Sequence, residues 1–75
     1  MNSDNEIKNV IKRIETILEL ERDISISQLI RSMNIKERIV LIAIGYMLRD
    51  EKIYLDEEYS RIALSFNQFS FLRLR

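Results

Sequence analysis

The stretch from Asn34 to Ile53, NIKERIVLIAIGYMLRDEKI, constrains this chain more than any other segment. Between Ile39 and Leu48 every residue except Gly45 is hydrophobic. The pattern predicts a helix over about 36–50, and a helix that is apolar on all sides is expected to be buried on all sides. Either the rest of the domain surrounds this helix, or a second copy of the chain covers its outer side.

The chain is short for the core that such a helix needs. Its 75 residues amount to one domain at most, and a domain of this size buries only about 60% of the surface of its unfolded chain. Hydrophobic residues make up 47% of the sequence, which is too many for a disordered protein. Because there is no cysteine, disulfides cannot supplement the core. We therefore expect dimerisation to supplement it.

The charge balance bears on the class of partner. Twelve basic and twelve acidic residues cancel, whereas most nucleic-acid modules carry a basic excess that neutralises phosphate. A local basic patch would still permit DNA binding. No apolar run reaches the roughly 18 residues that cross a membrane, and the polar start NSDNEIKN is unlike a signal peptide. We expect a cytoplasmic protein with no membrane partner.

The sequence has few of the residue types that catalysis and metal binding usually require. The chain has no histidine and no cysteine, and its single glycine excludes a glycine-rich phosphate loop. Glu57 and Glu58 are adjacent, so they would point apart on a strand and would not form an acid–base pair. Only carboxylates remain as ordinary metal ligands. We expect no enzymatic activity, no metal, no cofactor and no small-molecule substrate.

A capping pattern and a periodic run predict a first helix over about 4–21. Ser3 and Glu6 form a Ser-x-x-Glu box, in which each side chain satisfies a free backbone N–H at a helix start. The apolar residues that follow recur at helical spacing and make one face of this helix. They are Ile7, Val10, Ile11, Ile14, Ile17 and Leu18.

A second capping pattern predicts a short helix over about 26–33. Ser25 and Gln28 form its capping box. Ile24, directly ahead of the box, can add one or two residues of strand. Asn34 is the expected helix end, because asparagine tolerates the left-handed backbone conformation better than most residues.

The third helix has an inner and an outer side when residues are placed about 100° apart. Exposing Ile42 and Tyr46 on the outer side would forgo roughly 1.5–3 kcal/mol of burial for each side chain. Gly45 between them costs roughly 1 kcal/mol relative to alanine inside a helix. The inner side should face the core with Val40, Ala43, Ile44 and Met47, and the outer side carries Arg38, Ile42, Gly45 and Arg49, flanked by Ile39 and Tyr46.

Two segments near the end of the chain predict an antiparallel hairpin. Residues 53–55 and 62–66 carry large apolar side chains at every second position. The joining loop 56–60 has no glycine, so we expect it to be longer than a tight two-residue turn. Residues 67–75 keep large apolar groups among polar and basic ones, which predicts a third strand or an arm that reaches a partner.

The order helix, short strand, helix, helix, two-stranded hairpin resembles the winged helix-turn-helix family. The run from Ile24 to Ile35 looks like the first strand and second helix of that family. The run from Val40 to Ile53, VLIAIGYMLRDEKI, is similar to the third helix of small stand-alone bacterial winged-helix proteins, in which an Ala-aliphatic-Gly-aromatic core leads into Arg-acid-x-Lys-Ile. The resemblance covers about residues 7–66, and its most specific part is Ala43–Ile53.

This resemblance implies an α+β winged helix-turn-helix domain of three helices and a two- or three-stranded antiparallel wing. The domain would span residues 1–66, and 67–75 would be an apolar and basic tail that packs on the domain or on a partner. Two positions depart from the family pattern. Lys36 stands where a serine cap is usual, although Asn34 with Glu37 can cap instead, and Tyr59-Ser60 stands where an Asp-Gly-like turn is common.

By analogy of fold, the resemblance implies DNA binding in transcriptional regulation. The third helix would enter the major groove, and the wing would contact the DNA backbone or the minor groove. Against this function, residues 56–58 put three negative charges where phosphate would lie, and the simpler interpretation is that these charges only solvate a surface. The candidate DNA contacts are Arg31, Lys36, Arg38, Arg49 and Arg61.

The alternative is a homodimeric protein-interaction module of the same fold that does not read DNA. It is favoured by the neutral charge, the acidic wing and the apolar third helix. A glycine on the outer side of that helix would let a partner approach closely, although the chain's own tail can also fold back over this side. The candidate interface residues are Leu41, Ile42, Gly45, Tyr46, Phe69, Phe71 and Leu72.

Overall fold

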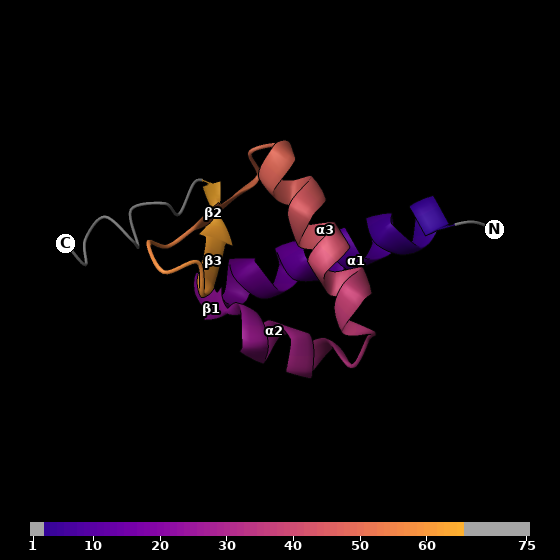
Figure 1. Cartoon of the computed structure of the whole chain (residues 1–75), viewed down its shortest axis with the longest axis horizontal. Helices are drawn as coiled ribbons and strands as arrows, with labels where there is room; N and C mark the ends of the chain where they lie inside the picture. Colours follow the sequence, from indigo (N-terminus) through magenta and orange to yellow (C-terminus); the bar gives the residue numbers. More distant parts are fainter. Residues whose placement is uncertain (1–2, 66–75) are drawn as a thin grey trace.

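The computed structural model describes residues 3–65, in which three helices pack with a three-stranded antiparallel sheet (Figure 1). The elements follow one another as α1 (Ser3–Glu21), β1 (Asp23–Ser25), α2 (Ile26–Met33), α3 (Glu37–Arg49), β2 (Ile53–Leu55) and β3 (Arg61–Leu64). This is the α+β winged helix-turn-helix predicted from the sequence. The strands β2 and β3 and the loop between them form the wing.

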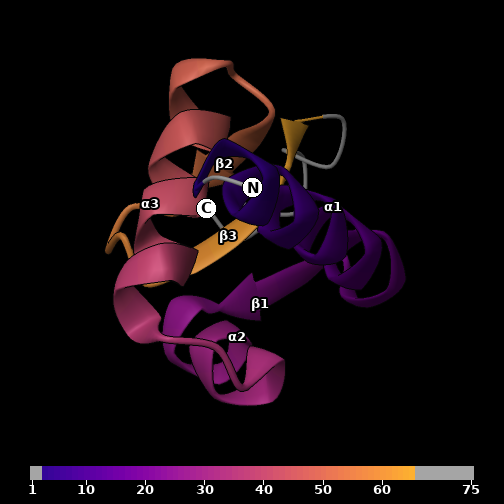
Figure 2. The ribbon, with the colours of Figure 1, turned by 90° about the vertical axis from the view of Figure 1, so that its right-hand side faces the viewer.

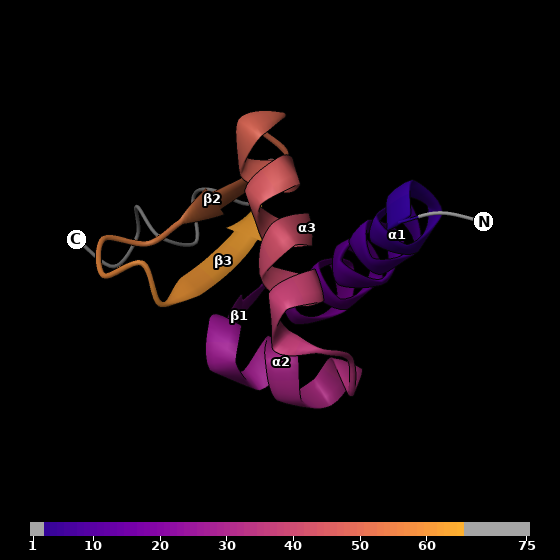
Figure 3. The ribbon, with the colours of Figure 1, turned by 45° about the vertical axis from the view of Figure 1, so that its right-hand side comes forward.

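The strand that joins the wing hairpin in the sheet is β1, which lies between α1 and α2 in the chain. The strand order is β1-β3-β2, and β3 pairs antiparallel with both neighbours. Ile24 of β1 and Leu55 of β2 lie on either side of Ile62 of β3. Figure 3 shows β1 beside the start of α2, while β2 and β3 extend away from α3. The short strand predicted at Ile24 therefore connects the helix-turn-helix to the wing.

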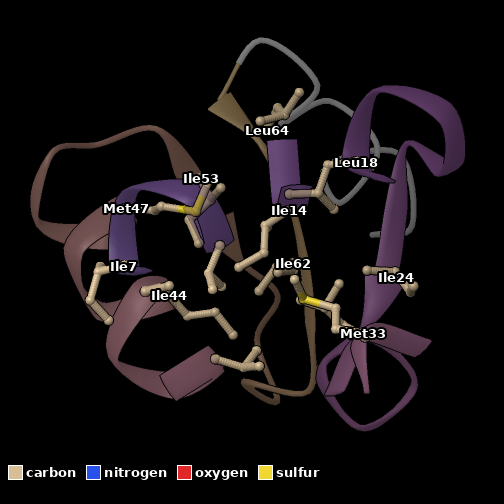
Figure 4. Close-up of a cluster of buried hydrophobic side chains, with 14 residues drawn as sticks. Ile7, Ile14, Leu18, Ile24, Met33, Ile44, Met47, Ile53, Ile62 and Leu64 are labelled. Atoms are coloured by element: carbon tan, nitrogen blue, oxygen red, sulfur yellow. The ribbon is translucent and has the colours of Figure 1, made fainter. Parts of the chain in front are cut away.

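One hydrophobic core joins all of these elements (Figure 4). The inner side of α3 is buried as predicted, since Val40, Ala43, Ile44 and Met47 are at most 5% exposed. The first helix of the prediction, α1, contributes its apolar face to this core, while its polar face is exposed. The largest fully buried side chains are Ile14, Leu18, Leu29, Met33, Val40, Met47 and Ile62.

Local signals set the limits of α2 as the sequence predicted. The Ser25 side chain caps its first turn, because the hydroxyl Oγ accepts a hydrogen bond of 3.1 Å from the backbone N–H of Gln28. Asn34 ends the helix in the left-handed conformation, with φ 55° and ψ 41°. The start and the end of α2 are thus set by the residues directly before and after it, Ser25 and Asn34.

Two helix starts differ from the prediction. α1 already includes Ser3, so its helical backbone extends one residue further than a box with Ser3 ahead of the helix allows. The residue before α3 is Lys36, which makes no side-chain capping hydrogen bond. The suggestion that Asn34 caps α3 is wrong, because Asn34 lies two residues further back and instead ends α2.

The predicted alternation of β3 is also only partly correct. Ala63 should face outward between Ile62 and Leu64, yet all three side chains are buried. Ala63 lies directly between Asp23 of β1 and Tyr54 of β2 in the sheet. Opposed residues in neighbouring strands share a face, so these two larger side chains flank the small one and cover it.

Candidate interaction face on α3

The outer face of α3, formed by Leu41, Ile42, Gly45 and Tyr46, lies open to solvent. The exposed fractions of its three large side chains are 44% for Leu41, 47% for Ile42 and 39% for Tyr46. Within the described residues 3–65, the domain therefore surrounds only the inner side of this helix. Of the two alternatives for covering this helix, the domain accounts for the inner side only, and an apolar surface remains exposed on the outer side.

Gly45 lies at the centre of the outer face and is exposed. Its φ is not in the left-handed region, so the backbone does not require glycine here. A Cβ built on it would meet no atom within 4 Å. The glycine is therefore not needed for packing within the domain, although it costs roughly 1 kcal/mol relative to alanine. It leaves the backbone of α3 without a side chain over it at this point of the outer face.

Arginines stand at both ends of the outer face. At the carboxyl end, Arg49 lies over the ring of Tyr46, with 4.9 Å from its Cζ atom to the ring centroid. Its Nε also lies 3.4 Å from Oδ1 of Asp50. At the amino end, Arg38 is exposed and forms no ion pair with any described residue.

The turn between α2 and α3 carries the other basic candidates. Arg31 lies in the last turn of α2, and Lys36 directly precedes α3. Both are exposed, and in the described part of the chain neither has an ion-pair partner. With Arg38 in the first turn of α3, they form a basic end of the helix-turn-helix.

The wing loop 56–60 is held by one carboxylate. Oδ1 of Asp56 accepts hydrogen bonds from the backbone N–H groups of Ser60 (2.8 Å) and Arg61 (3.1 Å), and Oδ2 accepts one from the Ser60 hydroxyl (3.3 Å). The N–H of Arg61, followed by the groups of Ser60, holds the pKa of this carboxyl below its ordinary value of 3.8. As expected, the loop is longer than a two-residue turn, and Tyr59 supplies its left-handed residue with φ 58°.

The basic residue at the end of the wing loop is already paired. Arg61 donates from Nε to Oδ1 of Asp23 at 2.8 Å, and its Nη2 lies 2.6 Å from the same oxygen. This pair links β3 to β1 across the sheet. Since Arg61 is the sole cation of residues 53–61, the wing has no unpaired positive charge to set against its three carboxylates.

The family comparison agrees with this architecture. A family described as winged helix-turn-helix domain (DUF2582) matches residues 13–66. The chain belongs to this family. The biochemical function of the DUF2582 family is uncharacterised, and its fold is one that generally serves DNA binding. No curated protein and no solved structure matches the chain.

In this DUF2582 domain, a groove between α1 and α3 lies beside the outer face. It encloses about 430 Å³, and Ile7, Ile11 and Tyr46 provide its apolar lining. Charged side chains surround that lining: Lys8, Lys12, Glu15, Arg49, Asp50 and Lys52. No local sequence pattern indicates this groove, because its two walls are more than thirty residues apart in the chain and meet only through helix packing.

Three predicted interface residues, Phe69, Phe71 and Leu72, lie outside the described residues. None of the helices within residues 3–65 is long and apolar enough to cross a membrane. That same part of the chain holds no cluster of three or more histidine, cysteine, aspartate or glutamate side chains placed to bind a metal ion.

Proposed function

We propose that this winged-helix protein is a protein-interaction module that pairs with a second copy of itself through the outer face of α3. The observation that carries this proposal is the exposure of Leu41, Ile42 and Tyr46 around Gly45, where an added side chain would meet nothing. Burying the fraction of each large side chain that is still exposed would contribute roughly 0.6–1.4 kcal/mol. The absence of cysteine is compatible with the cytoplasm as the compartment.

The charges of the wing support an interaction module over a DNA reader. A wing that contacts phosphate needs cations, but this one carries Asp56, Glu57 and Glu58, and its Arg61 is paired with Asp23. The helix that would enter the major groove presents an aliphatic and aromatic centre. Thymine methyl groups can be read by apolar contacts, but the usual specific contacts to bases are hydrogen bonds from polar side chains.

A charge placed in the outer face tests the pairing. Ile42→Asp would put a carboxylate into the apolar interface, and we expect the dimer dissociation constant to rise roughly thirtyfold or more. Sedimentation equilibrium from micromolar to millimolar concentration measures this constant. Leu20→Asp is the matched control, since Leu20 is 79% exposed on α1 and lies outside the outer face. A wild-type protein that sediments as a single chain throughout that range would contradict the proposal.

A second candidate function, DNA binding, is favoured by the exposed basic end of the helix-turn-helix. Arg31, Lys36 and Arg38 have no ion-pair partner within residues 3–65, so they are available to phosphate. Such contacts would serve a transcriptional regulator. They would weaken as the salt concentration rises, because the release of counterions from DNA on binding then becomes less favourable.

Electrophoretic mobility shift with random duplex DNA distinguishes this candidate. A DNA-binding protein should shift the duplex at about 50 mM salt and lose binding steeply as salt rises. Arg38→Glu combined with Arg49→Glu should abolish the shift while leaving the fold intact, as circular dichroism would show. An unshifted duplex at low salt would contradict DNA binding and would favour the interaction module.

A further inference from the structure

We propose that the wing of one copy docks in the groove between α1 and α3 of the second copy. This inference rests on the pairing proposed above and names the surfaces that flank the outer face. Two independent features support it: a positively charged groove with an apolar lining, and an acidic wing with an exposed aromatic side chain. The negative charge of the wing complements the positive charge of the groove, and the aromatic side chain of the wing fits the apolar lining of the groove.

The groove has an excess of positive charge although the whole chain is neutral. Its charged residues comprise four cations and two carboxylates. Both carboxylates already face a cation, since Glu15 lies 3.7 Å from Nζ of Lys52 and Asp50 lies 3.4 Å from Arg49. Lys8 and Lys12 form no ion pair with any residue in the range 3–65. They are one helical turn apart on α1, and like charges at this spacing destabilise a helix slightly unless an anion lies between them.

The wing presents the complementary chemistry on a preorganised loop. The hydrogen bonds of Asp56 to Ser60 and Arg61 fix the loop conformation before any partner arrives, which lowers the entropic cost of binding. Glu58 and Tyr59 project from this loop, and Tyr59 is 73% exposed. An aromatic ring beside a carboxylate fits a site with an apolar lining and lysines around it.

The wing and the groove lie on opposite sides of α3. Figure 1 shows the wing to the left of α3 and the amino-terminal half of α1 to its right, and Figure 2 shows the wing loop reaching as far outward as α3. If two outer faces meet about a two-fold axis parallel to α3, left and right are exchanged between the copies. The wing of each copy then lies beside the groove of the other. An axis perpendicular to α3 would instead place two acidic wings together, which their charges oppose.

The chain's own carboxyl-terminal segment is the alternative occupant of the groove. Residues 66–75 contain two arginines and no acidic side chain, so their side chains carry the same sign of charge as the groove. The wing carries the opposite sign. Charge complementarity therefore favours the wing of a second copy.

A charge exchange tests the contact. We expect Lys12→Glu and Glu58→Lys each to raise the dimer dissociation constant about tenfold, because each places like charges together. Combining the two in one chain should restore the constant to within about threefold of the wild type, since the pair is re-formed with reversed signs. Glu21→Lys, an exposed charge reversal on α1 outside the groove, is the matched control and should leave the constant unchanged.

Disulfide trapping gives a second test, because the chain has no cysteine of its own. Mixing Lys8→Cys chains with Tyr59→Cys chains under mild oxidation should give a cross-linked dimer in higher yield than either variant alone. A wild-type protein that is always monomeric would overturn both this contact and the proposed function. A dimer that Ile42→Asp disrupts, but that is indifferent to Lys12→Glu and Glu58→Lys and gives no mixed cross-link, would overturn the wing–groove contact alone.

Discussion

Single residues hold the parts of this small domain that no regular hydrogen-bond ladder covers. Asp56 accepts hydrogen bonds from two backbone N–H groups and one hydroxyl, and so holds a wing loop that contains no glycine. Asn34 and Tyr59 take left-handed backbone conformations at the end of α2 and in the wing. Asparagine tolerates this conformation well, whereas Tyr59 adopts it within a loop that the hydrogen bonds of Asp56 hold in place.

The hydrogen bonds of Asp56 make the wing sensitive to acid. Because folding lowers the pKa of this carboxyl below 3.8, the ionised form stabilises the wing at pH above that value. The contribution is lost as the pH falls through the lowered pKa. We expect the amide proton shifts of Ser60 and Arg61, followed by NMR, to titrate with a midpoint below 3.8. In Asp56→Asn this titration should disappear, and a midpoint above 4 would contradict the assignment.

At the scale of elements, α2 and α3 are linked by a turn that depends on the left-handed Asn34. Its φ of 55° is available to glycine and asparagine but is costly for β-branched residues. Asn34→Val should therefore lower the free energy of unfolding by about 1–3 kcal/mol. Asn34→Gly, the matched control, should change it little. Urea denaturation followed by circular dichroism measures both, and equal stabilities of the two variants would contradict the role of this backbone conformation.

The two faces of α3 show why its sequence is apolar all round. The inner face fills the domain core, while the outer face has no covering element within residues 3–65. Amphipathic helices of monomeric domains carry polar residues on the solvent side. The outer face is the surface that we propose to be covered by another copy of the chain.

At the scale of the whole molecule, stability depends on a core that a short chain can only just assemble. Leu18 and Leu20 lie two residues apart on α1, yet Leu18 is fully buried and Leu20 is 79% exposed. Leu18→Ala should reduce the free energy of unfolding by about 2–5 kcal/mol, enough to unfold much of a marginal domain. Leu20→Ala should change it by less than about 0.5 kcal/mol. Thermal denaturation of both variants checks this, and similar midpoints would contradict the burial of Leu18 in the core.

The sequence alone determined the presence and order of the three helices, the inner face of α3 and the limits of α2. Those features depend on capping residues, on a left-handed stop at Asn34 and on the spacing of apolar residues along one helix, all of which act within a few positions of the chain. Helical spacing also predicts the outer face of α3, since it places Ile42, Gly45 and Tyr46 opposite the core residues.

Only the tertiary structure decided what those elements bring together. The burial of Ala63 depends on strands that flank it from either side, and the ion pair of Arg61 depends on Asp23, 38 residues earlier in the chain. The groove likewise exists only because α1 and α3 pack together, which brings Lys8, Lys12 and Arg49 into one lining. Such contacts join segments that are distant in sequence, so no local pattern of residues specifies them.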